Sequence, residues 1–338
     1  MKKLYLKDIA QNLGLSKTTV SLVLNNKGDE NKISITTQKK VLDYTKAHNY
    51  KPNQLARALS RGKTETIGLI IPNISDTFYA KIAGRIEKKS KEYGYTVVFS
   101  SSNENAADEE KLIQSMLNRQ VDGLIIASTQ QNNKEIEQLK KINFPFVLID
   151  RHYPEIETNY VIVDNYNGVK KATEHLLGLG RRKIGFVSLE SELEALKQRL
   201  MGYKDALIEN RIKTSFIKEL NHDNFEEEMK LAISELTQVP NRVDAIVFST
   251  HYLTALGLRE LKRNNIDVPG DVAIVSFDEL SAFDLVEPPI TSIIQPVNRI
   301  GDLAVEILLN SIDHRNNKTN KKMILETEII IRKSCGSS

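Results

Sequence analysis

The feature that most constrains this chain is a pair of short amphipathic helices, which the sequence predicts within residues 6–25. The apolar face of the first helix is formed by residues at helical spacing: Leu6, Ile9, Ala10 and Leu13. Gly14 can adopt the left-handed backbone of a tight turn between the two helices. Ser16 stands at the N-cap of the second helix, where its hydroxyl can accept a hydrogen bond from the amide of Thr18 or Thr19.

Two helices joined this closely can hold the second one so that it enters the major groove of DNA. We expect Val20, Val23 and Leu24 to face the first helix. The side chains left on the outer face are candidates for contacts with base edges: Lys17, Thr18, Ser21 and Leu22. Ser16, Ser21 and nearby amides are candidates for phosphate contacts. The alternative interpretation is a helical hairpin within a larger fold.

A third helix is predicted from about Ile35 to Ala47, with Ser34 as its N-cap. Pro52 then fits the first turn of a further short helix. That helix would have only about eight residues, too few to be stable alone in water. Its Leu59 would be exposed without a partner.

The charges of the chain are divided unevenly along the sequence. Residues 1–63 carry 13 Lys and Arg against 4 Asp and Glu, whereas the remaining residues carry 34 against 40. A basic segment joined to an acidic body is the expected footprint of a DNA-binding module on a separate domain. A merely solvated basic surface is the alternative, and the helix-turn-helix pattern argues against it.

The cysteine and hydropathy patterns indicate a cytoplasmic protein. Cys335 is the one cysteine, so it cannot form an intrachain disulfide, and no thiolate metal site is indicated. No stretch approaches the length of a transmembrane span. Lys7 and Asp8 interrupt any secretory apolar segment near the start. We therefore expect a cytoplasmic location and no membrane partner.

The rest of the chain alternates between predicted strands and helices. The strand-like runs are Ile67–Ile71, Thr96–Phe99, Gly123–Ile126, Phe146–Ile149, Ile184–Val187, Ala245–Phe248 and Val272–Ser276. The helical patterns between them include Tyr79–Tyr93, Glu109–Arg119, Val169–Leu177, Arg199–Glu209, Phe225–Glu235 and Leu253–Asn264. This alternation predicts an α/β fold in which helices cover both faces of parallel sheets. Ligands of such sheets bind beyond the carboxyl ends of the strands.

Motifs of enzymes are weak or absent. Gly178-Leu179-Gly180 lacks the third glycine of a dinucleotide fingerprint and follows a helix, so a helix C-cap explains it better. The acidic runs Asp108–Glu110 and Glu226–Glu228 are interpreted as solvated first turns of helices. We expect no catalytic residue, no metal site and no cofactor.

At this point the chain resembles the lactose/galactose repressor family of bacterial transcription regulators. The resemblance begins with the helix-turn-helix, the third helix and the pattern that follows them: Tyr50, Pro52, Asn53, Ala56, Arg57 and Leu59. It continues over essentially the whole chain through Gly62–Pro72, Val121–Ile126, Asp150–Arg151, Val163–Asn165, Glu174–Gly180, Arg199–Tyr203, Val268–Val272, Phe277–Asp278 and Pro288–Thr291. Their order and spacing together are very specific.

The resemblance implies a helix-turn-helix headpiece and two Rossmann-like parallel-sheet subdomains of the periplasmic-binding-protein type. We place the headpiece at residues 1–50 and a hinge helix and linker at residues 51–62. The N-terminal effector subdomain is expected at residues 63–163 with about 293–318, and the C-terminal one at 164–290 with about 322–338. The chain would cross between subdomains near Val163-Asp164, Glu287–Ser292 and His314–Lys322.

The resemblance also assigns roles to residues of the hinge and the cleft. Leu59 stands at the position of a minor-groove wedge, with Asn53 and Ala56 beside it on DNA. The expected effector site consists of a polar pair, an aromatic wall and further polar residues: Arg199, Asp278, Phe78, Tyr79, Asp150, His251 and Tyr252. The alternative is that Phe78 and Tyr79 are core aromatics and that Asp278 is a turn residue.

The sequence departs from the family pattern at several of these positions. Leu22 replaces a common arginine, so the operator cannot be copied from relatives, and packing against the neighbouring helix is its alternative role. Tyr5 replaces a threonine cap. His251 and Tyr252 replace an Asn-Asp pair. Two polar contacts of purine-responsive relatives are also replaced, at Leu193 and Ala195, which makes a purine less suitable than a sugar.

These observations predict a transcriptional regulator, most simply a repressor, that binds a palindromic double-stranded DNA operator. A palindrome is read by two copies of the chain related by a two-fold axis, so a homodimer is expected. A tetramer is not expected, because no leucine heptad is found near the C-terminus. The expected effector is a small molecule, most simply a sugar or sugar derivative. The alternative is a cytoplasmic sugar-binding protein or a sugar-acting enzyme without operator specificity.

Overall fold

The chain folds into two compact units, residues 1–64 and residues 65–338. A computed structural model describes residues 4–50, 62–239, 242–314 and 320–337. The hinge residues Asn53, Ala56 and Leu59 lie outside these ranges, so their expected roles remain predictions.

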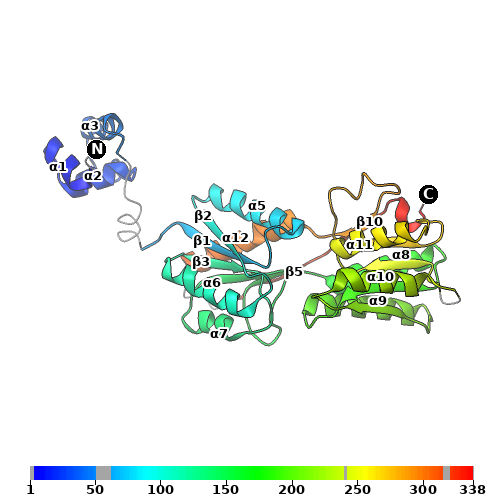
Figure 1. Cartoon of the computed structure of the whole chain (residues 1–338). Coiled ribbons are helices and arrows are strands. Elements are labelled where there is room, and N and C mark those ends of the chain that lie inside the picture. The colour runs from blue at the N-terminus through cyan, green and yellow to red at the C-terminus, as the bar shows by residue number, and fades with distance from the viewer. Residues whose placement is uncertain (1–3, 51–61, 240–241, 315–319, 338) are drawn as a thin grey trace. The chain divides into compact units, whose positions relative to one another are not determined.

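The first unit contains the three helices that the sequence predicts. They are α1 (Leu6–Leu13), α2 (Lys17–Leu24) and α3 (Ile35–Ala47), shown in blue in Figure 1. Gly14 adopts the left-handed conformation with φ +67°, and the hydroxyl of Ser16 accepts from the amide of Thr19 at 3.0 Å. In place of a threonine cap, the carboxylate of Asp8 accepts from the amide of Tyr5 at 2.9 Å. Local capping therefore sets the limits of α1 and α2.

The second unit begins with a lobe built on a parallel sheet. Its strands run in the order β11-β5-β4-β3-β1-β2. Their bounds are β1 (Thr66–Ile71), β2 (Thr96–Ser101), β3 (Gly123–Ile126), β4 (Phe146–Ile149), β5 (Tyr160–Val163) and β11 (Lys322–Leu325). The helices of this lobe are α5 (Thr77–Glu92), α6 (Ala106–Asn118), α7 (Lys134–Lys141) and α12 (Val297–Asp313).

The second lobe repeats this plan with a sheet of order β12-β10-β9-β8-β6-β7. Its strands are β6 (Ile184–Leu189), β7 (Phe216–Leu220), β8 (Ala245–Phe248), β9 (Ala273–Phe277), β10 (Thr291–Ile294) and β12 (Glu328–Ile330), of which β12 alone pairs antiparallel. Its helices are α8 (Asn165–Gly178), α9 (Glu194–Glu209), α10 (Phe225–Thr237) and α11 (His251–Arg263), and a 3-10 turn spans Lys333–Cys335. Gly180, with φ +89°, lies just beyond α8, as expected of a helix end.

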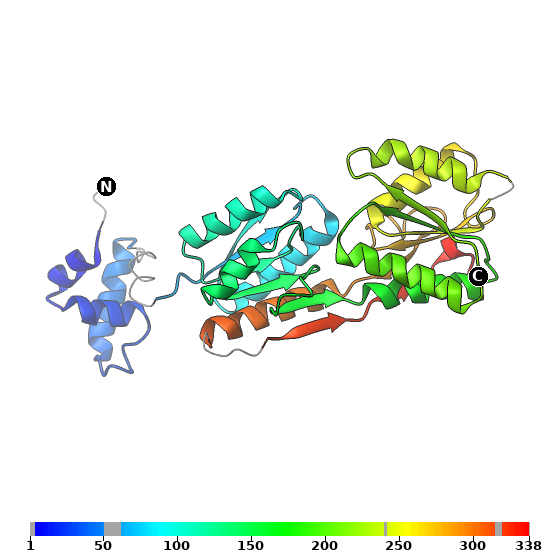
Figure 2. The same ribbon diagram turned by 90° about the horizontal axis from the view of Figure 1, so that it is seen from below.

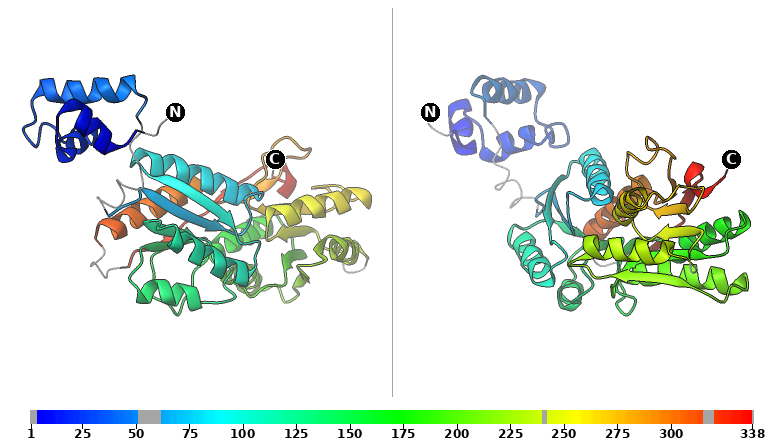
Figure 3. Two further views of the ribbon diagram at one scale, coloured as in Figure 1. Left: turned by 60° about the vertical axis from the view of Figure 1, so that its left-hand side comes forward. Right: turned by 45° about the vertical axis from the view of Figure 1, so that its right-hand side comes forward.

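The central strands of each sheet are buried on both faces, because helices cover both sides of the sheet (Figure 3). In β1, Leu69 and Ile71 join the core beneath α5 and α12, whereas Ile70 joins the core beneath α6 and α7. Successive side chains of a strand point to opposite faces, so an unbroken apolar run supplies both cores. In the second lobe, α8 and α9 lie over one face and α10 and α11 over the other.

The chain crosses between the lobes three times, and two crossings differ from the expected positions. The first lies between β5 and α8, as expected. The second lies at Gln295-Pro296 rather than near Glu287–Ser292, because β10 pairs with β9 in the second sheet. The third lies between Leu325 and Glu328 rather than near His314–Lys322, because β11 pairs with β5 in the first sheet (Figure 2). Residues 322–325 thus belong to the first lobe.

No helix in the described part of the chain is both long and apolar enough to cross a membrane. The described ranges also hold no group of three or more His, Cys, Asp or Glu side chains placed to hold a metal ion.

The contact between α8 and α9 gives a test of this packing. A Cβ added at Gly202 in α9 would lie 2.2 Å from the backbone oxygen of Tyr166 in α8, whereas one at Gly84 in α5 would meet nothing within 4 Å. Gly202→Ala should therefore destabilise the second unit by about 3 kcal/mol, because backbone cannot move aside easily. The matched variant Gly84→Ala should be neutral or stabilising by up to about 1 kcal/mol. Urea unfolding followed by circular dichroism measures both, and equal midpoints for the two variants would contradict the packing described.

Candidate DNA-reading helix and ligand cleft

The outer face of α2 presents the residues expected to read DNA. Lys17 and Thr18 are exposed, and Ser21 and Leu22 are half-buried. The hydrophobic core of the headpiece contains Ile9, Ala10, Leu13, Val20, Val23 and Val41. Leu22 is not a member of this core, although its side chain is partly buried. The face offers a cation, hydroxyls and one apolar side chain, which are groups that can contact base edges.

A cavity of about 880 Å³ lies between the two lobes of the second unit. Its walls are formed where strands of both sheets end and helices begin, which is the usual ligand position in such folds. All seven residues expected in the effector site line it: Phe78, Tyr79, Asp150, Arg199, His251, Tyr252 and Asp278. Leu193 and Ala195 line it as well. The structure therefore brings together residues that lie up to 200 positions apart in the sequence.

Arg199 is held firmly by the second lobe. Its Nε donates to Oδ1 of Asn165 at 2.8 Å, and its Nη1 donates to the backbone oxygen of Ser249 at 2.7 Å. The guanidinium also lies 3.5 Å from the centre of the Phe277 ring. Burial lowers the pKa of Arg199, while the charge of Asp278 raises it. Among the described residues Nη2 has no hydrogen-bond partner, so it is the donor left for a ligand.

Asp150 and Asp278 occupy equivalent places in the two lobes. Each directly follows a strand, β4 or β9, and each adopts a left-handed backbone, with φ +63° and +66°. Asp150 accepts from the hydroxyl of Tyr79 at 2.7 Å, and Asp278 accepts from Nε2 of Gln295 at 2.9 Å. Burial raises the pKa of Asp278 to about 6, although Arg199 and the Gln295 hydrogen bond act in the opposite direction. Two carboxylates thus face one cavity from opposite lobes.

The aromatic residues of the cleft combine two roles. Tyr79 is only 6% exposed and belongs to the core of the first lobe, yet it also lines the cavity beside Phe78. Burial is the main reason that the pKa of Tyr79 is raised well above its usual value. Tyr252 packs edge-on against Phe225, with 5.8 Å between ring centres. The interpretation of Tyr79 as a core aromatic and its interpretation as a cleft residue are therefore both valid.

His251 lies opposite the first turn of α5 across the cleft. Its Nε2 is 3.5 Å from the hydroxyl of Thr77 and 3.8 Å from Oδ2 of Asp76, both in the other lobe. Its Nδ1 is buried without a hydrogen-bond partner among the described residues. Burial lowers the pKa of His251, whereas Asp76 raises it and Arg199 lowers it further. The ring is thus a cross-lobe contact made through Nε2.

A second cross-lobe contact was not foreseen from the sequence. Oε1 of Gln130, from the first lobe, accepts from the amide of Glu194 at the start of α9 at 3.3 Å. Nε2 of Gln130 donates to the backbone oxygen of His152 within its own lobe. Leu193, which precedes α9, supplies no side-chain cap, so Gln130 serves that helix end from across the cleft.

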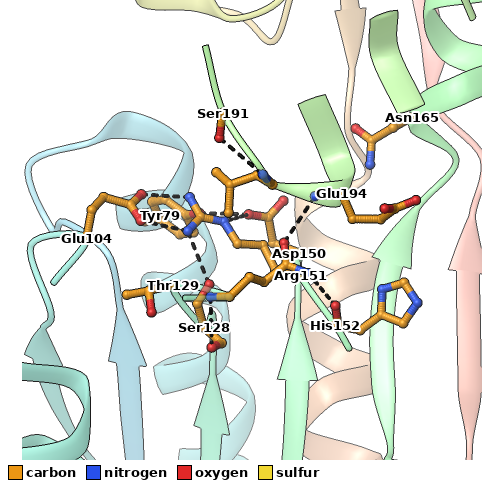
Figure 4. A network of polar contacts seen from close by, with 12 residues as sticks. Tyr79, Glu104, Ser128, Thr129, Asp150, Arg151, His152, Asn165, Ser191 and Glu194 are labelled. Carbon is orange, nitrogen blue, oxygen red and sulfur yellow. Dashed lines mark hydrogen bonds and ion pairs between the residues drawn. The ribbon is translucent and has the colours of Figure 1, made fainter. Parts of the chain in front are cut away.

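The floor of the cleft holds an ion pair that the sequence reasoning also missed (Figure 4). Arg151 donates from both terminal nitrogens to the two carboxylate oxygens of Glu104, each at 2.7 Å. It also donates to the backbone oxygen of Ser128 at 3.1 Å. The signal was present, since Arg151 directly follows Asp150 at the end of a strand. Glu104 is the third residue after β2, which ends at Ser101.

The interpretation of residues 108–110 as a fully solvated helix turn is wrong for Glu109. This side chain is 3% exposed and accepts from the hydroxyl of Ser128 at 2.7 Å and from the amide of Thr129 at 2.6 Å. Burial raises the pKa of Glu109, while these hydrogen bonds lower it. Glu109 turns inward because the loop after β3 presents donors that only a buried acceptor can satisfy. Asp108, in contrast, is partly exposed and pairs with Lys111.

Comparison with known proteins identifies the same two parts. Residues 5–53 match the model of bacterial regulatory proteins of the lacI family, and residues 173–335 match the periplasmic binding protein-like domain. The chain is 33% identical over 305 residues to catabolite control protein A of Priestia megaterium, covering 89% of this chain and 90% of that protein. It is 30% identical over 329 residues to a ribose operon repressor of Halalkalibacterium halodurans, covering 97% and 96%.

Solved structures share the fold. The Lac repressor dimer bound to operator and the anti-inducer ONPF matches with a TM-score of 0.85 at 21% identity, covering 99% of each chain. The complex of the transcriptional regulator CelR with cellobiose matches with a TM-score of 0.71 at 25% identity, covering 98% of this chain and 99% of that one. The helix-turn-helix region and two-lobed α/β body are therefore those of a Lac repressor-like fold.

Asp278→Asn tests the cost of burying this carboxylate. Because the native pKa of about 6 lies above the ordinary value of 3.8, the native state binds more protons between these values, and its stability falls as the pH rises through them. Above pH 6 the ligand-free variant should exceed the parent in stability by roughly 1–3 kcal/mol, and below about pH 4 the difference should vanish.

Urea unfolding between pH 4 and pH 8 measures this difference. Asp284→Asn, which removes an exposed carboxylate from the following turn, is the control and should follow the parent at every pH. A constant offset between Asp278→Asn and the parent over the whole range would show that Asp278 carries no such cost.

Proposed function

The chain belongs to the lacI family of bacterial regulatory proteins, and we propose that it is a repressor that binds a palindromic operator as a homodimer under the control of a saccharide in the interlobe cleft. Its relatives are transcriptional regulators, so the chain is a DNA-binding regulator and not a sugar-acting enzyme. The observation that carries the proposal is the pairing of an exposed reading face on α2 with a cavity lined by polar groups from both lobes.

The DNA contacts are assigned to α2 and the segment that follows α3. Lys17 and Thr18 reach base edges, Ser16 and Ser21 approach phosphates, and Leu22 contacts a thymine methyl group. A leucine cannot donate to a guanine edge, so the operator differs from those read by an arginine at this place. A single headpiece covers one half-site, which is why a two-fold dimer is required for a palindrome.

The hinge segment couples the headpiece to the body. Its helix forms on the operator, where Leu59 inserts into the minor groove and Asn53 and Ala56 lie beside the backbone. Ordering so short a helix costs free energy, and this cost is offset only by the contacts made in the dimer–operator complex. Operator affinity is therefore sensitive to the geometry of the two lobes.

A saccharide suits the groups that line the cleft. Arg199 offers a free donor, Asp150 and Asp278 offer acceptors from opposite lobes, and Phe78 and Tyr252 supply apolar faces. A ligand with hydroxyl groups on several sides satisfies donors and acceptors of both lobes at once. The names of relatives agree with this class, since one is a ribose operon repressor and another was solved with cellobiose.

Control follows from this bridging position. A ligand that contacts both lobes stabilises one lobe geometry over others, and it changes operator affinity by its difference in affinity between those geometries. His251 and Gln130 already join the lobes, so the ligand acts on an interface with defined contacts.

Lys17→Ala tests the reading face of α2. An unbiased selection from random duplexes with the full chain should first yield a palindrome. On that duplex the variant should bind at least about tenfold more weakly and lower the slope of log K against log salt by about one, because one cationic contact is lost. Lys230→Ala, in α10 of the second unit, removes the same charge and should change neither quantity. No enriched palindrome in the selection would contradict operator binding.

Thermal shift in a panel of monosaccharides and disaccharides tests the cleft. A saccharide that binds the native state raises the melting temperature of the parent, by a free energy that grows with concentration as RT ln(1 + [L]/Kd). The same saccharide should raise the melting temperature of Asp150→Ala far less, because the cleft of this variant has lost one hydrogen-bond acceptor. It should also change the affinity for the selected duplex. A panel without any response would remove the saccharide from the proposal.

A further inference from the structure

The cleft contains a buried arginine whose donors are already used. Arg151 is 8% exposed and lines the cavity, a place where a guanidinium fork would ordinarily bind a phosphate or a carboxylate. Here the carboxylate of Glu104 accepts hydrogen bonds from both terminal nitrogens of Arg151, each at 2.7 Å. The backbone oxygen of Ser128 accepts a further hydrogen bond from Nη1 (Figure 4). The carboxylate of Glu104 thus occupies the position that an anionic ligand would need.

The backbone places Glu104 there at an energetic cost. Asn103 and Glu104 are consecutive left-handed residues, with φ +52° and +56°. Asparagine adopts this conformation readily, but for glutamate it costs about 1–2 kcal/mol. Hydrogen bonds fix the segment, since Asn103 donates to the oxygen of Pro72 at 2.8 Å and Gln131 donates to that of Glu104 at 3.0 Å. Strain of this kind persists only where the surroundings over-determine it.

The remaining charges of the cleft also disfavour anions. Two arginines line the cavity, and the buried or partly buried carboxylates that line it with them outnumber them: Asp76, Glu104, Asp150 and Asp278. The second arginine, Arg199, keeps one terminal nitrogen free, because Asn165 and Ser249 take its other donors. A phosphate entering this cavity would meet a negative field and no complete fork of donors.

We propose that Glu104 determines ligand specificity: by neutralising Arg151 it makes the cleft select uncharged saccharides and reject phosphorylated or carboxylated ones. This inference rests on the proposed saccharide effector. In the parent, an anion can reach Arg151 only by displacing a carboxylate that holds both nitrogens and is covalently attached to the same lobe. Without that carboxylate, Arg151 keeps only Asp150, whose Oδ2 lies 3.5 Å from its Nε, and its two terminal nitrogens become available to an anion.

Glu104→Gln in the full chain tests the assignment. Glutamine keeps the size of the side chain and one acceptor but removes the charge. Melting temperatures are measured with inorganic phosphate, and with glucose and galactose, their 6-phosphates and their uronates, each compared with the ligand-free protein of the same variant. We expect the parent to respond to no anion, and Glu104→Gln to bind phosphate and the sugar phosphates at least tenfold more tightly than the parent does.

Two further variants separate this effect from a general change of charge. Glu137→Gln removes an exposed carboxylate from α7 of the same lobe, outside the cavity, and should leave the anion response as in the parent. Adding Arg151→Gln to Glu104→Gln should abolish the gained response, because the gain depends on the freed guanidinium.

The outcomes distinguish this inference from the proposed function. Anion affinities of Glu104→Gln within twofold of the parent would overturn it, as would a parent that binds a sugar phosphate as tightly as the neutral sugar. The third outcome is that phosphate raises the melting temperature of Glu104→Gln although the parent binds no neutral saccharide. That result would support the role of Glu104 and contradict the proposed saccharide effector.

Discussion

The structure depends on one arrangement, in which the carboxyl ends of two parallel sheets face the same cavity. Side chains that directly follow a strand are delivered to the cleft, and this explains the matched places of Asp150 after β4 and Asp278 after β9. Both residues adopt a left-handed backbone there, which turns their carboxylates toward the ligand space. The three crossings keep the two sheet edges opposed, so each lobe supplies half of the site.

Burial of charge in this cleft is a source of both cost and selectivity. Burial raises the pKa of the Asp278 carboxylate, and the terminal nitrogen of Arg199 that the protein does not use lines the same cavity. Groups left unsatisfied by the protein define what a ligand must bring, namely hydrogen-bond donors for the carboxylates and an acceptor for Arg199.

Features that depend on local residues could be predicted from the sequence. The bounds of α3, Ile35–Ala47, and the cap at Ser16 follow from periodicity and capping chemistry alone. The seven cleft residues came from the family resemblance, since no periodicity brings such distant positions together. Features set by long-range packing could not be predicted in this way. They are the sheet that β11 joins, the inward orientation of Glu109 and the ion pair between Glu104 and Arg151. α12 was omitted although its apolar residues recur at helical spacing, so that signal was present.

One strand connects the cleft with the start of the second unit. β1 begins at Thr66, two residues after the headpiece unit ends, and just before this strand the amide of Glu65 donates to the carboxylate of Asp122 at 2.9 Å. At the other end of β1, the oxygens of Ile71 and Pro72 accept from Ser102 and Asn103, which position Glu104 in the cleft. A strand of six residues is stiff and about 20 Å long. One stiff element therefore joins the segment that positions Glu104 in the cleft to the point where residues 1–64 are attached.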